Sequence, residues 1–265
     1  MQMGYTNLPP QVNGAGWFGG LLGLSRMVAG LVLATGLSTC GPDSTCLKST
    51  GSIITERREV APGLTHIVMF DNVDLRLVQD SLTYAEVRAG KNLIGDIGFN
   101  RQGYTLEISN SSTCNWLRSY NTPREVTLHL PRFRKILILG YGNVSTVGQF
   151  ALDTVYFDLN GRGNFDLNVK ARQLFIDQDD VGDVTVRGEA TQLGLFLAGA
   201  GQLFAQGLAT ERCYFDLTRE SYGSAYVRSS GNLGGRLKGE GSLYYSGSPS
   251  YIDIVVTGKG RVVPQ

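Results

Sequence analysis

Four aspartates fall within seven residues of the chain, in the stretch DQDDVGD: Asp177, Asp179, Asp180 and Asp183. Carboxylate oxygens at this density can ligate Ca²⁺, and a facing pair of carboxylates can act as the acid and base of a glycoside hydrolase. The alternative is a solvated turn whose aspartates accept backbone N–H bonds. In an extended chain, alternation sends Asp177 and Asp179 to one face and the other two elsewhere, which favours the turn.

Glycine pairs such as Gly161-Arg162-Gly163 resemble a phosphate-binding loop at first sight. A dinucleotide fingerprint needs G-x-G-x-x-G at the start of a helix inside a βαβ unit. The third glycine is missing after Gly163, and no helical periodicity follows it. We therefore predict that these glycines have a structural role.

Histidine and cysteine chemistry is sparse. The two histidines, His66 and His129, stand apart, and no C-x-x-C motif occurs, which argues against a zinc site. No Ser/His/Asp or Cys/His constellation is evident, so the sequence predicts no catalytic residues and no cofactor, with Ca²⁺ at the four aspartates as the one metal hypothesis. The 24 basic and 23 acidic residues nearly cancel without a basic stripe, which argues against nucleic acid as a partner.

The start of the chain has the character of an export signal. Residues 1–39 contain no acidic residue and one base, Arg26, followed by the apolar run MVAGLVLATGLST. A run of about 13 residues is too short for a membrane span but fits a signal-peptide core. The stretch LSTC resembles a bacterial lipobox, although Thr39 stands where Gly or Ala is usual. We expect a signal over 1–39 with lipid on Cys40, or else an ordinary secretory signal cleaved nearby.

Export implies an oxidising compartment, so the remaining cysteines are candidates for a disulfide framework. If Cys40 carries lipid, three thiols remain and one is left over. We favour a Cys46–Cys114 disulfide, which would join a tether over 40–50 to a polar loop. Cys213, in RCYFDL, lies among strand-like residues and is expected to be a small buried side chain.

Two aromatic groups could contact a ligand. Trp116 and Tyr120 flank Arg118 in NWLRSY, a composition suited to stacking on sugar rings; alternatively, Trp116 covers one end of the core and Tyr120 leads into a strand. Tyr244 and Tyr245 are adjacent, so one of them must face outward in a strand. That tyrosine could bind glycan or protein, or could belong to a stabilising ladder.

The elements that position these residues come from an internal repeat. Seven phrases are anchored on Gly142, Gly163, Gly182, Gly201, Gly223, Gly241 and Gly260, at successive spacings of 21, 19, 19, 22, 18 and 19 residues. The residue two positions after each anchor is apolar. Five anchors are preceded by a second glycine, two residues earlier: Gly140, Gly161, Gly199, Gly239 and Gly258.

This pattern predicts strand, glycine corner and strand in every copy, with alternate residues buried. A unit this short cannot bury its apolar side alone, so the copies must stack as coils of a parallel β-solenoid. At each corner glycine would relieve crowding by the next coil and permit positive φ. An antiparallel sandwich would instead show hairpins at 8–12-residue spacing. Residues 51–135 alternate without anchors, and we interpret them as wider first coils closing one end of a single domain over 51–265.

CLKSTGSIITERREV, DNVDLRLVQ, VRAGKNLI, CNWLRSY and the serial glycine units resemble the head GIN domain family, exported Bacteroidota-type proteins known as putative auto-transporter adhesins. The resemblance covers roughly residues 46–265. It implies a right-handed β-helix of the pectate-lyase-like kind, with about 19–22 residues per coil here, and it places Cys46 and Cys114 in the family framework. Two corners depart from the glycine pair, Asp180-Val181-Gly182 and Ser221-Tyr222-Gly223, where irregular corners or insertions are expected.

Together these features predict a non-catalytic cell-envelope protein, an adhesin or surface-binding scaffold. The alternative is a polysaccharide lyase or hydrolase on the same fold. Expected partners are the membrane, through the N-terminal lipid, and a glycan or surface protein, with self-association through the open solenoid end. The expected location is the outer membrane, facing either the periplasm or the cell surface.

Overall fold

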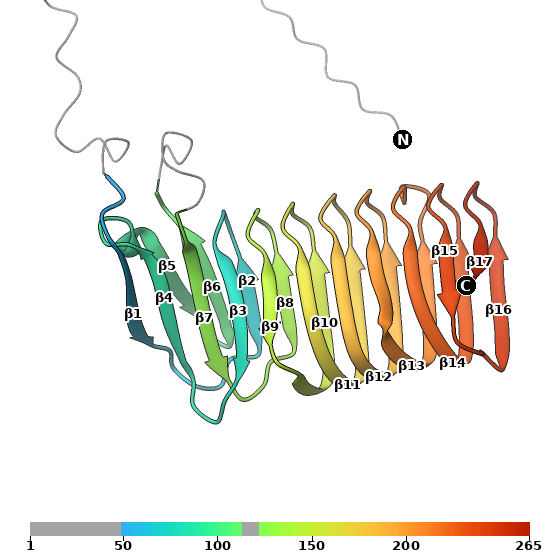
Figure 1. The fold of residues 1–265 in the computed structure, drawn as a ribbon, viewed down its shortest axis with the longest axis horizontal. Helices are drawn as coiled ribbons and strands as arrows, with labels where there is room; N and C mark the ends of the chain where they lie inside the picture. Colours follow the sequence, from blue (N-terminus) through green and yellow to red (C-terminus); the bar gives the residue numbers. More distant parts are fainter. Residues whose placement is uncertain (1–48, 113–121) are drawn as a thin grey trace, which may run out of the picture. The chain divides into compact units, whose positions relative to one another are not determined.

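The computed structural model describes residues 49–112 and 122–265, which belong to one compact unit (Figure 1). The 17 strands of these residues form one continuously hydrogen-bonded sheet. A short 3-10 turn, η2 (Ile94–Asp96), lies between β4 and β5 along the chain. The fold is the expected parallel β-solenoid. No helix in the described part of the chain has the length and apolar character needed to cross a membrane.

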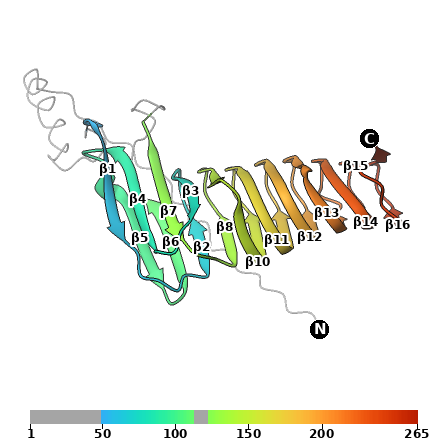
Figure 2. The same cartoon turned by 60° about the horizontal axis from the view of Figure 1, so that its bottom comes forward.

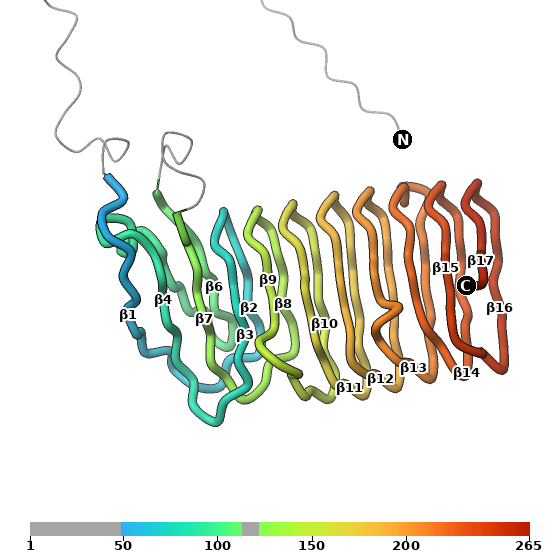
Figure 3. Tube along the Cα trace, viewed as in Figure 1, coloured from blue at the N-terminus to red at the C-terminus, as the bar shows by residue number. Residues whose placement is uncertain are grey.

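Each coil of the C-terminal half has two faces that meet at the glycine corner. Face A is defined by the strand segments that precede the corner and face B by those that follow it. The long strands start on face B, pass the opposite edge and finish on face A, and equivalent residues such as Phe165 and Val184 pair 19 positions apart (Figure 3). These strands are β11 (Phe165–Gln178), β12 (Val184–Leu197), β13 (Leu203–Leu217) and β14 (Ala225–Leu237).

In the flanking coils the same path is divided into shorter strands. Those on face A are β8 (Lys135–Ile138), β10 (Phe150–Leu159) and β16 (Tyr251–Val256). Those on face B are β9 (Val144–Val147), β15 (Leu243–Ser246) and β17 (Val262–Pro264). Because β14 pairs with β15 through its first half and with β16 through its second, the break between these strands marks the edge opposite the glycine corner.

The core consists of columns of apolar side chains that repeat from coil to coil. One column is fully buried along five successive coils: Val155, Leu174, Leu193, Cys213 and Leu233. Cys213 takes an ordinary place in this column, with no disulfide partner among the described residues, and burial raises the pKa of its thiol to about 12. The repeated burial of alternate residues agrees with the period-two pattern of the sequence.

The corner glycines rest on one another. A Cβ at Gly163 would lie 1.9 Å from the carbonyl oxygen of Gly142, and a Cβ at Gly182 would lie 1.8 Å from that of Gly163. The same contact recurs up to Gly260, whose Cβ would meet the Gly241 oxygen at 1.9 Å. None of the seven anchors has positive φ. The corner therefore needs glycine for space, and the expectation that it also uses positive φ was wrong.

The two departing corners keep the stack in different ways. Gln178 is buried beneath the Asp180 corner, where its Nε2 donates to the carbonyl oxygen of Gly182 at 2.6 Å. At the other corner, the hydroxyl of buried Ser221 donates to the carbonyl oxygen of Gly223 at 3.2 Å. Of these two corners, only the second carries an insertion, because Leu203 pairs with Ala225, 22 residues later.

A polar ladder follows the corner, and it was not predicted from the sequence. The residue after each anchor but the last offers a side-chain oxygen that accepts the backbone N–H of the equivalent residue one coil later. Thus Asn143 Oδ1 accepts from Asn164 N at 3.1 Å, and Asn164 Oδ1 accepts from Asp183 N at 2.8 Å. The ladder comprises Asp74, Asn143, Asn164, Asp183, Gln202, Ser224, Ser242 and finally the backbone N–H of Arg261. The signal in the sequence is an oxygen-bearing side chain directly after every anchor except the last.

The N-terminal part differs from the expectation of successive wider coils (Figures 1 and 2). Only two pairs of strands form coils in the described residues before β8: β2 (His66–Met69) with β3 (Asp74–Gln79), and β6 (Thr105–Asn110) with β7 (Arg124–Leu130). The pair that comes later in sequence lies further out, because β2 pairs with β6 on one side and with β8 on the other.

Three antiparallel strands cover the outermost coil: β1 (Ile53–Glu59), β4 (Tyr84–Gly90) and β5 (Ile97–Gln102). We call them the N-terminal cap. Strand β5 joins β6 through a turn at Gly103, which has a φ of +61°, and so short a turn permits only antiparallel pairing. This region closes one end of the core, as expected, but it does so by reversing the chain and not by adding coils.

Candidate functional site

Several residues singled out from the sequence lie outside the described part of the chain. They are the lipid-anchor candidate Cys40, the disulfide candidates Cys46 and Cys114, and the aromatic group Trp116, Arg118 and Tyr120. Their proposed roles remain predictions.

The four clustered aspartates take separate places. Asp183 belongs to the polar ladder, where its Oδ1 accepts from Gln202 N at 2.7 Å, and Asp180 accepts from Val181 N at 2.9 Å. Asp177 lies on face A, and Asp179 follows at the end of that strand. No group of three or more metal-ligating side chains suited to a metal ion occurs within residues 49–112 and 122–265. Asp180 and Asp183 thus bind backbone N–H groups, as the alternative interpretation required.

The adjacent tyrosines of β15 point in different directions. Tyr245 packs against the core, whereas Tyr244 stacks on Tyr226 with ring centroids 4.7 Å apart. Phe204 extends this stack, 5.3 Å from Tyr226. The three rings form a ladder on face B in which flat surfaces cover one another, so this arrangement favours the stabilising role over ligand contact.

A second aromatic row, on face A, leaves ring surfaces open. Tyr156 and Phe175 stack with centroids 4.8 Å apart and planes 12° apart. The register places Gly194, Tyr214 and Gly234 in the same row on the following coils. Tyr156 is 37% exposed and Tyr214 is 41% exposed, so their rings are accessible to a ligand.

The glycines of this row create hollows between the rings. A Cβ at Gly194 would lie 2.6 Å from the Phe175 ring, which leans over the glycine backbone. A hollow of about 470 Å³ extends from Lys135 and Tyr156 to Tyr214, and a second of about 310 Å³ continues from Tyr214 to Tyr251. We call this run of rings and hollows the face A groove.

Carboxylates line the neighbouring row of the groove. Asp158, Asp177 and Asp216 share this row with Phe196, which is 40% exposed. Asp158 forms an ion pair with Lys135. Asp216 forms ion pairs with Arg236 and Lys238, both at 2.9 Å.

Asp177 is the carboxylate of this row without such a partner among the described residues. Its Oδ1 is buried and receives no hydrogen bond from them. Burial, followed by the negative charges of Asp179 and Asp158, raises the pKa of Asp177 to about 6. This carboxyl group therefore has unused hydrogen-bonding capacity beside the aromatic row, and it changes charge close to neutral pH.

Open aromatic faces beside carboxylates suit a ligand with apolar ring faces and hydroxyl donors. We did not predict this groove, although the sequence carries a signal for it. Segments VYFDL, LFIDQ, LGLFL and CYFDL, which start at Val155, Leu174, Leu193 and Cys213, place an aromatic residue, aspartate or glycine at their outward positions. These outward positions reveal the row once the segments are aligned in register from coil to coil.

The head GIN domain family, described as a putative auto-transporter adhesin, matches residues 63–249. This match covers β4 and β5 of the cap and the solenoid up to β15, and it ends before β16 and β17 of the last coil. The chain belongs to this family. No curated protein matches the sequence.

Several solved structures share the fold of this chain. A putative adhesin from Bacteroides fragilis superposes with a TM-score of 0.73 at 20% identity, covering 81% of this chain and 97% of that one. A putative adhesin from Parabacteroides distasonis superposes with a TM-score of 0.59 at 20% identity, covering 81% of this chain and 98% of that one. A putative lipid binding protein from the same species gives 0.60 at 16% identity, covering 80% and 97%. At these identities the likeness concerns the fold.

Proposed function

We propose that this head GIN domain protein is a non-catalytic adhesin of the cell envelope that holds extended glycan chains in the face A groove. The observation that carries the proposal is the row of rings on face A, of which Tyr156 and Tyr214 are exposed, beside the carboxylates Asp177 and Asp216. Sugar rings have apolar faces that can lie on aromatic rings, and their hydroxyls can donate to carboxylate oxygens.

The shape of the groove favours a linear polymer. From Tyr156 to Tyr251 the register crosses five coil-to-coil steps, which at about 4.8 Å each gives about 24 Å. A chain laid along the solenoid axis would meet rings and carboxylates repeatedly, and many weak contacts then add up to retention. We further propose that the protein is exported as an outer-membrane lipoprotein anchored through Cys40, consistent with the lipobox-like stretch LSTC.

The test is a glycan array followed by titration of the purified protein with neutral oligosaccharides of increasing length. Tyr214→Ala should weaken binding at least tenfold, about 1.4 kcal/mol, because it removes a central ring. The matched control is Tyr222→Ala, which removes a tyrosine that is 64% exposed at a corner outside the groove. Equal affinity of the two variants would contradict the assignment of the groove.

A second candidate function, glycan cleavage, draws on the same carboxylates. Asp158 and Asp177 are partners in the register, and one is ion-paired while the other has a pKa of about 6. Such a difference between neighbouring carboxyl groups is what an acid and a base require. The test is to measure new reducing ends while the protein is incubated with a glycan that it binds. If new ends form and Asp177→Asn abolishes them, the protein is an enzyme and the adhesin proposal fails. If the glycan is retained and no new ends form, the adhesin proposal is supported.

A further inference from the structure

A further hollow lies next to the groove and has a different character. It measures about 920 Å³ and is lined by β10, β11 and the segments that precede β2 and β8, where Phe133, Leu64 and Leu152 contribute apolar side chains. Three arginines line it, Arg132, Arg134 and Arg172, against the single acidic residue Asp153. The charges in this hollow therefore do not cancel.

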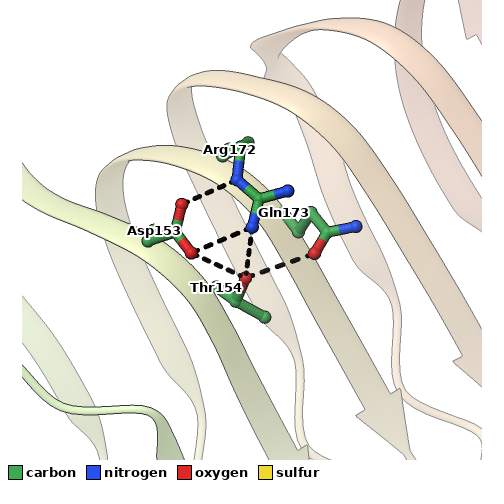
Figure 4. Close-up of polar contacts among 4 residues, drawn as sticks. All are labelled: Asp153, Thr154, Arg172 and Gln173. Atoms are coloured by element: carbon green, nitrogen blue, oxygen red, sulfur yellow. Dashed lines mark hydrogen bonds and ion pairs between the residues drawn. The ribbon is translucent and has the colours of Figure 1, made fainter.

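The carboxylate of Asp153 forms an ion pair with Arg172 (Figure 4). Arg172 Nε donates to Asp153 Oδ1 at 2.7 Å and Nη2 donates to Oδ2 at 3.0 Å, a two-pronged pair between neighbouring coils. Thr154 supports the same carboxylate, with its hydroxyl 3.2 Å from Oδ2. The hydrogen bond from Arg172 is the main cause that lowers the pKa of Asp153, and the charge of Arg134 adds to it. Asp153 thus stays ionised and bound to Arg172.

Arg132 and Arg134 are exposed, and neither forms an ion pair or side-chain hydrogen bond with the described residues. The segment that carries them is nevertheless fixed. Phe133, between them, is buried and packs edge-on against Phe150 and Phe157 at 5.1 and 5.9 Å. The backbone N–H of Arg134 donates to Thr65 O at 2.8 Å. Both arginines line this hollow, one on each side of the buried Phe133.

The hollow is continuous with the groove. A smaller hollow of about 470 Å³ shares Thr65 and Arg134 with it, and shares Lys135 and Tyr156 with the groove. A saccharide lying in this hollow would have the two unpaired guanidinium groups within its reach and an apolar floor beneath its ring. Guanidinium groups match carboxylate and phosphate oxygens in a two-pronged geometry.

We propose that Arg132 and Arg134 form an anion-binding site for a carboxylate or phosphate group carried on a sugar. This site is separate from the neutral-glycan contacts proposed for the groove, and it holds whether or not those contacts are made. Its ligand class is an acidic saccharide whose ring rests on the Phe133 side of the hollow.

The experiment is calorimetric titration of the full chain with two acidic probes, trigalacturonate and glucose 1-phosphate. In parallel, each probe is compared with the corresponding sugar that lacks the acidic groups. The wild type should bind at least one acidic probe more than tenfold tighter than the neutral counterpart, and 500 mM NaCl should weaken this binding severalfold because the site is open to solvent. If only trigalacturonate binds, the site takes a carboxylate, and if only glucose 1-phosphate binds, it takes a phosphate. Failure of both acidic probes to bind overturns the proposal.

The double variant Arg132→Ala/Arg134→Ala should weaken the acidic probe at least tenfold, and Arg132→Lys/Arg134→Lys should lie between it and the wild type because charge remains without the fork. Arg219→Ala is the matched control, since Arg219 is an exposed arginine far along the chain, on the inserted segment before Ser221. Unchanged affinity in the double alanine variant overturns the proposal. Neutral glycan binding, and its loss in Tyr214→Ala, reports on the groove alone, so the two proposals can fail separately.

Discussion

The interior coils and the last coil share one sequence pattern but differ in what covers them. Leu193 and Ile252 occupy the same core column, yet Leu193 is fully buried and Ile252 is 47% exposed. Interior strands have a paired strand on both sides, whereas β16 pairs only with β14 and β17 only with β15 among the described strands. In a solenoid the burial of a residue is therefore set by its neighbours in the stack, and much less by its own repeat.

The largest expected effect is at the corner. Gly163→Ala places a Cβ against the Gly142 oxygen inside the stack, where coils on both sides prevent a shift, so we expect a loss of about 3 kcal/mol or more in the free energy of unfolding. Gly260→Ala makes the same contact in a coil that can move outward, and should cost clearly less. Urea unfolding of both variants measures the difference. Equal losses would show that the last coil is held as firmly as the interior.

The core column should show the next largest effect. Leu193→Ala leaves a cavity in a fully buried position, with an expected loss of about 2–5 kcal/mol. Ile252→Ala, in the same column of the half-exposed last coil, should lose less than about 1 kcal/mol. Thermal unfolding of the two variants provides the comparison. A large loss for Ile252→Ala would mean that another surface covers the last coil in solution.

A smaller effect is expected in the polar ladder. Asn164→Ala removes the acceptor for Asp183 N and the donor to Asn143 Oδ1, both at 2.8 Å, and should cost about 1 kcal/mol at this exposed corner. Arg261→Ala at the end of the ladder removes no acceptor used by a later coil and should be neutral. Hydrogen exchange of the Asp183 amide is the direct readout, with faster exchange expected only in Asn164→Ala.

The smallest effect concerns the carboxyl group of Asp177. Because its pKa is raised from 3.8 to about 6, the folded protein holds the proton more tightly than the unfolded chain, so stability from this group is present below pH 3.8 and is lost as pH rises through 6. The free energy of unfolding of Asp177→Asn should therefore match that of the wild type near pH 4. At pH 7 it should be higher by about 1 kcal/mol, after allowance for solvent screening. Asp253→Asn, the same substitution in the exposed last coil, is the matched control. If Asp177→Asn is less stable than the wild type at pH 7, the conclusion that the Asp177 carboxylate has no partner is contradicted.

The repeat allowed the solenoid to be predicted because each coil repeats the same backbone constraint. Gly142 to Gly260 stack as their spacing implied, and the alternating residues 51–135 contain strands such as β4, β6 and β7. The N-terminal order could not be predicted, because nothing local specifies that β2 lies between β6 and β8. Pairing between strands distant in sequence depends on packing of whole coils.

The candidate site was harder to predict than the fold. Tyr156, Phe175 and Tyr214 lie tens of residues apart and meet only through the register of the coils. Proximity in sequence was misleading in the opposite case, since Asp177 to Asp183 are neighbours along the chain but serve the groove, a turn and the ladder. Arg132 and Arg134 gave no signal, because an arginine without a partner is apparent only once its surroundings are known.

The polar ladder also has a direction. Every side-chain oxygen, from Asp74 to Ser242, accepts a backbone N–H that comes later in the chain. During synthesis each new corner therefore emerges to find its acceptor already in place on the preceding coil, as the order of translation supplies acceptors before donors. Loss of a terminal coil at the C-terminal side would leave no N–H group of the ladder unsatisfied, whereas loss of a coil from the other side would orphan one. The corner thus favours vectorial assembly and gradual evolutionary lengthening or shortening at the C-terminal end.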